Sequence, residues 1–238
     1  MLSIGAFLFA QVQEGGSLTC KYTIGSSWLF TEIGEGGKKP ILLEENSTLK
    51  PGDSLHTKEQ SLCEIENKCF HLRIGSNSIV ETDINTITIT RGSTLLYLKN
   101  PAEITIKSKL STLFTKGEYT AIIDSTSNGG FKFIPLEGKG EIIPEQGEAK
   151  NIYRGRLTMV LGSPSKLGNA YDIDLLLLLK SSRLINSFPT PLPSMKRISL
   201  SIYAQQLRMK GKYNALIGDA PTDDNLQMWA FGEDDNKE

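Results

Sequence analysis

The segment LKPGDSLHTKEQSLCEIENKCFHLRIGSNSIVETDINTITITRGSTLLYL, residues 49–98, contains the clearest structural pattern in the chain. Short runs of β-forming residues alternate in it with four turn sequences, at Pro51-Gly52-Asp53, Glu66-Asn67, Gly75-Ser76-Asn77 and Arg91-Gly92. This spacing is typical of a compact all-β unit, because Gly, Pro, Asn and Asp readily adopt the backbone angles of tight turns. The pattern predicts a fold class and leaves the function open.

Strand-like segments continue on both sides of this segment. Residues 14–45 hold short β-forming runs separated by glycines, with a flexible loop expected at residues 34–39. Further strands are expected at 95–98, 103–107, 110–115, 118–124, 131–135, 141–143 and 156–161. The chain is therefore predicted to be mainly β, with many short strands in a sandwich or a solenoid-like wrap and a helical extension at the C-terminus.

One hairpin of the segment can be assigned a buried face, because side chains alternate between the two faces of a strand. The residues expected in the core are Cys63, Ile65, Phe70, Leu72 and Ile74. Cys69, His71 and Arg73 fall on the opposite face of the second arm. We expect Arg73 to be exposed.

The composition is that of an ordinary globular protein. The 238 residues include 39% hydrophobic and 22% charged residues, and the formal net charge is −1. A chain of this length can bury a sizeable core, and this charge balance gives no general attraction to nucleic acid or to an anionic membrane. We therefore expect no nucleic-acid partner.

The amino terminus allows three interpretations. Residues 4–10 form an uncharged apolar run that reaches the lower length limit of the hydrophobic part of a signal peptide, but no basic residue precedes it. A shortened signal sequence and a first β-strand both fit this run. A membrane anchor fits less well, because about 20 apolar residues are needed to span a bilayer.

Helical patterns follow Gly162-Ser163-Pro164. Residues 171–185 (YDIDLLLLLKSSRLI) carry aspartates near the start and an arginine near the end, which favours the helix dipole, although a buried strand also fits the five leucines at 175–179. Residues 195–210 are a clearer helix, with Ser194 as its N-cap and Gly211 at its end. Beyond about Gly218 the chain is poor in apolar residues and is expected to fray.

The helix at 195–210 also provides a candidate interaction face. The residues assigned to it are Met195, Ile198, Ile202, Leu207 and Met209. A helix of this length is marginal when isolated in water, so we expect this face to pack on the β unit or on the leucines at 175–179 rather than to stand free. If this face does not pack on the rest of the chain, we expect it to bind a partner protein.

A zinc site must be considered because both histidines and two of the three cysteines lie within sixteen positions, at His56, Cys63, Cys69 and His71. Strand alternation argues against it, since Cys63 is in phase with the buried positions while Cys69 and His71 are out of phase. A disulfide between Cys63 and Cys69 and separate thiols are the competing interpretations. We expect no metal.

Other motifs that could carry chemistry are incomplete. Residues 163–166 match S-x-x-K, but Pro164 and the absence of S-D-N and K-T-G sequences indicate a loop. The glycine runs at 34–37 and 138–140 lack the following Lys-Ser/Thr pair and the helix of a phosphate loop. Asp53 is expected to cap its own turn by a hydrogen bond to the backbone two residues further on. We therefore expect no enzyme activity, no cofactor and no small-molecule substrate.

The order of turns and strands resembles the FecR domain, the periplasmic part of bacterial iron-dicitrate-type sensor and regulator proteins. The resemblance is carried by PGD at 51–53 with Leu55 and Thr57 after it, by LRIGSNS at 72–78 and by RGSTLLYL at 91–98. It extends more weakly from about Ser47 to Gly168, through Gly117, FIPLEGKGEII and IYRGRLTMVL.

The resemblance implies a location and a role. In that family the domain lies outside the cytoplasmic membrane and relays the state of an outer-membrane receptor to a sigma factor, through an N-terminal cytoplasmic segment and one transmembrane helix. Neither of these parts is expected in these 238 residues. The resemblance therefore implies a non-enzymatic periplasmic or secreted module that does not span the membrane and acts in protein–protein interaction or envelope signalling, with an envelope protein as its partner.

These expectations divide the chain into four parts: a candidate signal-peptide remnant at 1–13, a FecR-like all-β domain at 14–168, a helical extension at 169–218 and a tail at 219–238. The alternative function is a structural component of the cell envelope that associates with copies of itself.

Overall fold

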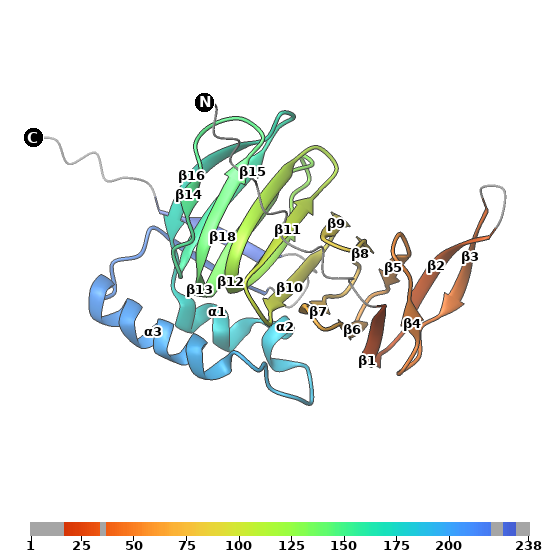
Figure 1. Cartoon of the computed structure of the whole chain (residues 1–238). Coiled ribbons are helices and arrows are strands. Elements are labelled where there is room, and N and C mark those ends of the chain that lie inside the picture. The colour runs from red at the N-terminus through yellow and green to blue at the C-terminus, as the bar shows by residue number, and fades with distance from the viewer. Residues whose placement is uncertain (1–16, 34–36, 220–225, 232–238) are drawn as a thin grey trace, which may run out of the picture.

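The computed structural model describes residues 17–33, 37–219 and 226–231. With 54% strand and 13% helix it is mainly β, which confirms the predicted fold class. Long central strands have the helices on one side and the first strands of the chain on the other (Figure 1). The expectations for residues 1–13, and with them the apolar run at 4–10, lie outside the described residues.

The main sheet curls, so that two groups of strands, which we call wings, face a common core. The first wing runs in the order β3 (Gly37–Leu42), β2 (Ser27–Ile33), β5 (Ser54–Thr57), β8 (Ile79–Thr82), β9 (Thr86–Arg91) and β11 (Ala102–Lys107). The second wing runs in the order β10 (Ser93–Leu98), β7 (Phe70–Ile74), β6 (Leu62–Glu66), β1 (Leu18–Ile24) and β4 (Thr48–Leu49).

The wings meet at a long strand, β12 (Thr112–Ser125). Residues 112–117 of β12 pair with β11 of the first wing, and residues 120–124 pair with β10 of the second. The other edge of β12 pairs with β13 (Phe131–Pro144), which in turn pairs with β14 (Lys150–Asn151) and β15 (Arg156–Leu161). Strand β16 (Lys166–Asp172) pairs with β15.

Strands β12 and β13 correct the prediction of shorter strands separated at Gly117 and at 138–140. Both strands are continuous, and Gly117 lies directly opposite Gly140 in the register. A Cβ atom on Gly117 would lie 2.7 Å from the Cα of Gly140, and both residues have strongly positive φ angles, of 148° and 152°. These glycines therefore allow two backbones to approach closely within a hairpin, and they do not end strands.

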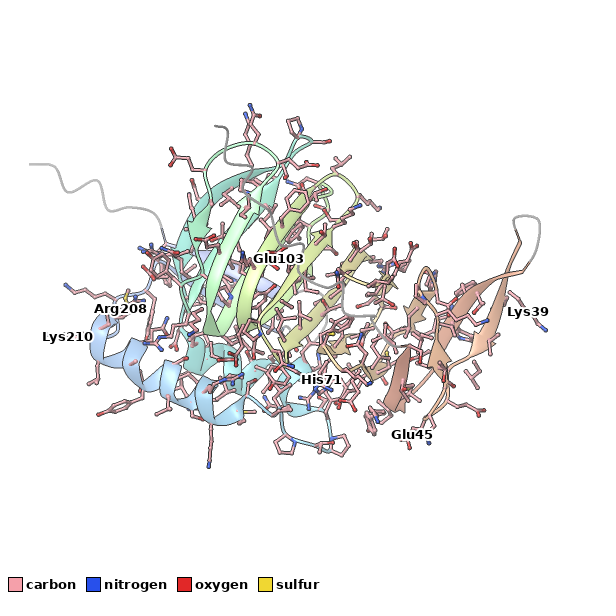
Figure 2. All side chains as sticks on the ribbon, in the orientation of Figure 1. Lys39, Glu45, His71, Glu103, Arg208 and Lys210 are labelled. Carbon is pink, nitrogen blue, oxygen red and sulfur yellow. The ribbon has the colours of Figure 1, made fainter. Side chains whose placement is uncertain are left out.

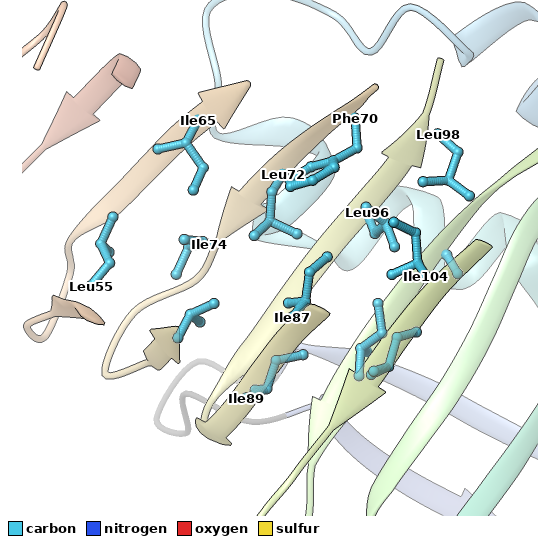
Figure 3. Packing of buried hydrophobic residues seen from close by; sticks show 14 of the residues in the cluster. Leu55, Ile65, Phe70, Leu72, Ile74, Ile87, Ile89, Leu96, Leu98 and Ile104 are labelled. Atoms are coloured by element: carbon cyan, nitrogen blue, oxygen red, sulfur yellow. The ribbon is translucent and has the colours of Figure 1, made fainter. Parts of the chain in front are cut away.

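The first core lies between the wings and confirms the face assigned to the β6–β7 hairpin (Figure 3). Its hairpin residues are Cys63, Ile65, Phe70, Leu72 and Ile74, all of which are buried. From β9 it takes Ile87 and Ile89, the inward positions of that alternating strand. The expectation that Arg73 is exposed is wrong, since Arg73 has 0% of its surface accessible.

A second layer covers the outer face of β10, β12, β13 and β15. Its elements are α1 (Leu175–Ser181), α2 (Arg183–Asn186), α3 (Met195–Met209), β17 (Ala215–Asp219) and β18 (Leu226–Ala230). Apolar residues of this layer form a second core with outward-facing residues of the sheet, among them Leu95, Ile122 and Leu136. In Figure 1 the three helices lie together along one side of the sheet.

The predicted helix at 171–185 is corrected to a strand end followed by two short helices. Tyr171 and Asp172 complete β16, and the side chain of Asp174 caps α1 by accepting hydrogen bonds from the backbone N–H groups of Leu176 and Leu177. Ser182, in an extended conformation, separates α1 from α2. The leucines at 175–179 are thus helical, and the alternative of a buried strand is wrong.

Two segments expected to lack regular structure form strands. Residues 37–39, placed in a loop, belong to β3, where Pro40 is tolerated because β3 ends the strand order of its wing. Leu226–Ala230, placed in a fraying tail, pairs with β17, and Leu226 is buried in the second core. Residues 34–36, 220–225 and 232–238 are outside the described part. Within that part, none of the helices has the length and hydrophobicity needed to cross a bilayer.

Candidate functional site

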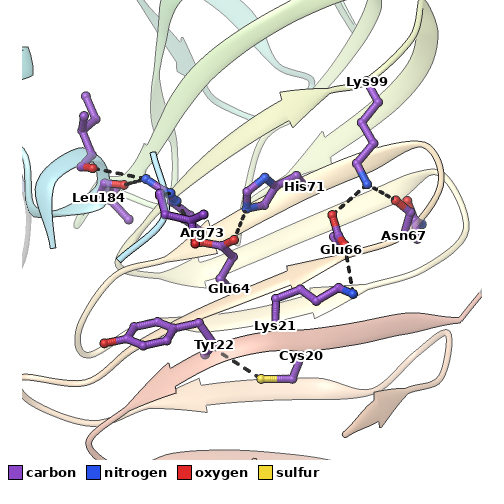
Figure 4. Close-up of polar contacts among 12 residues, drawn as sticks. Cys20, Lys21, Tyr22, Glu64, Glu66, Asn67, His71, Arg73, Lys99 and Leu184 are labelled. Atoms are coloured by element: carbon purple, nitrogen blue, oxygen red, sulfur yellow. Dashed lines mark hydrogen bonds and ion pairs between the residues drawn. The ribbon is translucent and has the colours of Figure 1, made fainter. Parts of the chain in front are cut away.

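The candidate site is the outer face of α3. Polar and charged residues of the sheet hold the second layer, to which α3 belongs, in place. Arg73 of β7 points into this layer (Figure 4). Its Nη1 donates to the backbone oxygens of Leu184 and Ile185, at 3.2 Å each, and its Nη2 donates to the backbone oxygen of Thr190. Its guanidinium carbon also lies 4.4 Å from the centre of the Phe188 ring.

The charge of Arg73 is balanced by Glu64 on the neighbouring strand β6. The Nε of Arg73 donates to Glu64 Oε2 over 3.1 Å, and His71 Nε2 lies 2.9 Å from Glu64 Oε1. Burial opposes ionisation of Glu64, but His71 and Arg73 outweigh it and hold the pKa of the Glu64 carboxyl below its usual value. The ion pair between the Glu64 carboxylate and the Arg73 guanidinium explains how these two charges are tolerated inside the protein.

A second polar anchor fixes the start of α3. The hydroxyl of Thr120 donates to Glu137 Oε1 over 2.5 Å and lies 2.8 Å from the hydroxyl of Ser194. Arg197 donates to Glu137 Oε2 over 2.9 Å and to Glu118 Oε1 over 3.0 Å. Ser194 is therefore the N-cap residue, as predicted, but its side chain binds the sheet and not the helix backbone.

A third anchor joins the middle of α3 to the start of α1. The side chain of Gln205 accepts a hydrogen bond from the backbone N–H of Leu175 at 3.2 Å and donates to the backbone oxygen of Ile173 at 2.7 Å. Gln205 is itself buried. With anchors at its start and in its third turn, α3 is held in one orientation on the sheet, so its outer face is a defined surface.

The outer face of α3 carries an apolar stripe, which we call the outer stripe, made of Leu200, Tyr203 and Leu207. These side chains are 66%, 63% and 61% exposed. Their spacing of three and four residues places them on one side of the helix. Lys196 and Lys210 are exposed on the same side, and α3 contains no acidic residue. Figure 2 shows Lys210 projecting from the end of the helix.

The structure separates the residues of the predicted interaction face. Ile198 and Ile202 are buried in the second core, and Met195 packs against it. Met209 is half-buried. Leu207 lies on the outer stripe. It is five residues after Ile202, and five residues rotate around the helix by a full turn plus about 140°. The face that packs and the face that is open are therefore different sides of α3.

The residues considered for zinc do not come together. Cys63 is in the first core, and Cys69, expected on the opposite face, packs against that core because it lies in the turn before β7, where strand alternation does not apply. His71 is on β7 beside Glu64, and His56 is on β5 in the first wing. None of the three cysteines forms a disulfide, so the pairing of Cys63 with Cys69 is wrong. Burial raises the pKa of Cys20 to about 11 and that of Cys63 well above its usual value, which makes both thiols weak nucleophiles. Among the described residues, no group of three or more His, Cys, Asp or Glu could hold a metal ion.

The remaining motifs have structural roles. Ser163, the serine of the S-x-x-K sequence, is exposed in the turn before β16. Ser165, within the same turn, is buried, and its hydroxyl accepts a hydrogen bond from the backbone N–H of Glu145 at 3.0 Å. Lys166 is already the first residue of β16. Asp53 accepts a hydrogen bond from the backbone N–H of Lys50 at 2.7 Å, so its side chain caps its turn through a residue three positions earlier and not through one two positions later.

Sequence reasoning did not identify the polar anchors that hold the outer layer. Arg73, Glu64 and Glu137 each look like solvent-facing strand residues, because polar residues at alternate positions normally face water. The leucine-rich segment at 175–179 was the available signal, since it requires a surface to cover, but it did not indicate which surface. No family model, curated protein or solved structure matches the chain.

Proposed function

We propose that this chain is a non-enzymatic, FecR-like module that binds another protein outside the cytoplasm through the outer stripe of α3. The observation that carries the proposal is the exposure of Leu200, Tyr203 and Leu207 on a helix that is already held by its other side. A helix that needed only to pack on its own sheet would gain nothing from large apolar side chains on this face. Contiguous exposed apolar side chains rimmed by polar ones are typical of interaction sites.

The charge of the surface defines the partner. Lys196 and Lys210 flank the outer stripe, and α3 carries no carboxylate. A complementary surface would offer an apolar groove with acidic residues at its rim, because opposite charges speed association and like charges exclude wrong partners. We therefore propose an acidic, amphipathic segment of an envelope protein as the partner.

The proposal is tested by photo-crosslinking in cells that express the natural gene. A photoreactive amino acid in place of Tyr203 is expected to give one major adduct, and the same reagent in place of Tyr153, which is half-exposed on the loop before β15, is the matched control. The identified protein is then purified and its affinity for the module is measured by calorimetry. We expect Leu200→Asp to abolish this binding.

Two results would contradict the proposed interaction. The first is an adduct pattern at position 203 that is the same as the pattern at position 153. The second is an affinity in calorimetry that Leu200→Asp leaves unchanged. Either result would show that the outer stripe is not the binding surface.

Export from the cytoplasm is a separate part of the proposal. It rests on the apolar run at residues 4–10 and on the resemblance to a periplasmic domain. Fractionation of cells that express the gene from its natural start codon is expected to recover the protein outside the cytoplasm. An intact amino terminus in the cytosolic fraction would contradict export.

A second candidate function, self-association in the cell envelope, is favoured by strand β16. Among the described strands, β16 pairs only with β15, and its other edge is open from about residue 166 to 170. An open edge strand can pair with another copy of the same chain. Light scattering after size exclusion would then show oligomers that Asn169→Pro abolishes and Leu200→Asp leaves intact. The outer-stripe proposal predicts that neither substitution changes the mass of the isolated protein.

A further inference from the structure

We propose that the chain also binds an anionic sugar, in a groove on the outer face of the first wing. The groove has a volume of about 450 Å³, which lies in the range of about 300–1,000 Å³ typical of small-molecule sites. Strands β2, β3 and β5, which contribute to it, lie on the side of the molecule away from the helices (Figure 1). The groove is therefore separate from the outer stripe and independent of the proposed protein partner.

Strand alternation explains why aromatic side chains line this groove. Leu29 of β2 is buried in the first core, so its neighbours Trp28 and Phe30 point to the outer face. His56 of β5 lies directly opposite Trp28 in the register. The centres of the Phe30 and His56 rings are 4.2 Å apart, and His56 Nε2 lies 3.0 Å from the hydroxyl of Ser54.

The aromatic rings supply a surface suited to a sugar. Trp28 and Phe30 are both half-buried in the wall of the groove, so part of each side chain is accessible to a ligand. The face of an aromatic ring carries negative charge density, which attracts the slightly positive C–H groups on the apolar side of a sugar ring. A ring platform of this kind in a shallow groove favours a flat ligand of one to three sugar units.

The charges of the groove favour an anion. Its lining includes the cationic side chains of Lys58 and Arg91 and contains no aspartate or glutamate. Glu81 of β8 is paired with Ser54 in the register and does not line the groove. Because the guanidinium group of Arg matches the geometry of carboxylate, sulfate and phosphate groups, Arg91 and Lys58 would hold the anionic substituent while the rings hold the sugar.

Hydrogen bonds within the chain fix the rim of the groove. The hydroxyl of Thr57 donates to the backbone oxygen of Gly75 over 2.6 Å and accepts from the backbone N–H of Ser78 at 2.9 Å. The backbone N–H of Asn77 donates to the oxygen of Lys58 at 3.1 Å. These bonds join the two turns that border the groove, so a ligand would bind without the entropic cost of ordering them.

An oligonucleotide fits the groove less well than an anionic sugar. Aromatic rings and basic residues also bind single-stranded nucleic acids, but that mode uses a positively charged track along the backbone of several nucleotides. The chain as a whole has 26 basic and 27 acidic side chains, so it offers no general attraction to a polyanion of that length.

The proposal is tested by fluorescence titration of the full chain. Trp28 and Trp229 are the two tryptophans, and Trp229 lies on β18, so a Trp229→Phe background leaves Trp28 as the only reporter. Trigalacturonate and a sulfated disaccharide are the anionic probes, and maltotriose is the neutral one. We expect at least one anionic probe to change the emission of Trp28 with saturation, and the tighter of the two to identify the anionic substituent as carboxylate or sulfate.

Substitutions in the groove complete the test. Arg91→Gln and Lys58→Gln are each expected to weaken binding of the anionic probe by about tenfold with unchanged melting temperatures, while Arg154→Gln, an exposed arginine on the loop before β15, leaves it unchanged. Three results would overturn the proposal: no saturable change with either anionic probe, equal affinity for maltotriose, or tighter binding of a ten-nucleotide oligothymidylate.

Discussion

The two faces of strand β7 are equally inaccessible to water, but for different reasons. On the inner face, Phe70, Leu72 and Ile74 pack with other apolar residues between the two wings. On the outer face, Arg73 is covered by the segment that contains α2, and its burial depends on hydrogen bonds and on the charge of Glu64. The comparison shows that alternation identifies the apolar face of a strand and does not identify which faces are covered.

The two faces also respond differently to loss of a side chain. Deleting apolar atoms from the inner face removes burial and leaves a cavity. Deleting one member of the outer network leaves its partners buried and unpaired, and the cost of that state exceeds the net contribution of the intact interaction. Four substitutions test this distinction, and their expected effects on stability decrease from the first to the last.

Arg73→Ala is expected to lower the free energy of unfolding by about 3–5 kcal/mol. It would leave the buried Glu64 carboxylate without the guanidinium that balances its charge and remove the donors to Leu184, Ile185 and Thr190. Urea denaturation measures the loss. Arg154→Ala, at an exposed position, is the matched control and should change stability by less than about 0.5 kcal/mol. A loss below about 1 kcal/mol for Arg73→Ala would mean that the outer layer does not depend on this anchor.

Leu72→Ala is expected to cost about 2–5 kcal/mol through lost burial and a cavity in the first core. Amide hydrogen exchange separates this effect from that of Arg73→Ala. We expect Leu72→Ala to speed exchange across both wings, and Arg73→Ala to speed it first in residues 183–194. The same exchange pattern for both variants would show that the two faces belong to one cooperative unit.

Asp124 is expected to make the stability of the outer face of the sheet depend on pH. This buried outer-face residue of β12 accepts a hydrogen bond from Lys132 at 2.7 Å, and Lys132 also donates to the backbone oxygen of Leu226 in β18. Burial raises the pKa of Asp124 from 3.8 to about 6, against the opposing effect of Lys132. At pH values between 3.8 and about 6, Asp124 is more fully protonated in the folded state than in the unfolded state. The raised pKa therefore stabilises the folded state below about pH 4, and this stabilisation is lost as the pH rises to about 6.

The measurement compares wild type with Asp124→Asn by urea denaturation at several pH values. Between pH 4 and pH 6.5 the wild type should lose about 2 kcal/mol of unfolding free energy relative to Asp124→Asn. Asp172→Asn, which removes a carboxylate near the surface, serves as the control. A difference that stays constant over this range would mean that Asp124 titrates normally.

Leu200→Asp is expected to have the smallest effect, less than about 0.5 kcal/mol, because the side chain is on the open face of α3. Ile202→Asp, two positions away, should remove roughly 1.5–3 kcal/mol of burial and expose α3 to protease. Thermal melting and limited proteolysis compare the two. If both variants behaved alike, the division of α3 into a packed face and an outer stripe would be wrong.

Much of the fold could be predicted from local patterns. The turns at Gly75-Ser76-Asn77 and Arg91-Gly92, the inward face of the β6–β7 hairpin and the helix from Met195 to Met209 all follow from short-range periodicity. These features are predictable because the spacing of side chains along a strand or a helix is set by backbone geometry within a few residues. The buried half of α3 was found in the same way, through Ile198 and Ile202.

Tertiary contacts determined the rest. Gly117 and Gly140 look like strand ends in isolation, and only their pairing across β12 and β13 shows that they permit close backbone approach. Arg73 looks like a solvent-facing residue until the segment around residues 184–190, more than a hundred positions later, brings carbonyl groups to it. Burial of a polar side chain depends on what distant parts of the chain place against it, and local periodicity contains no information about such partners.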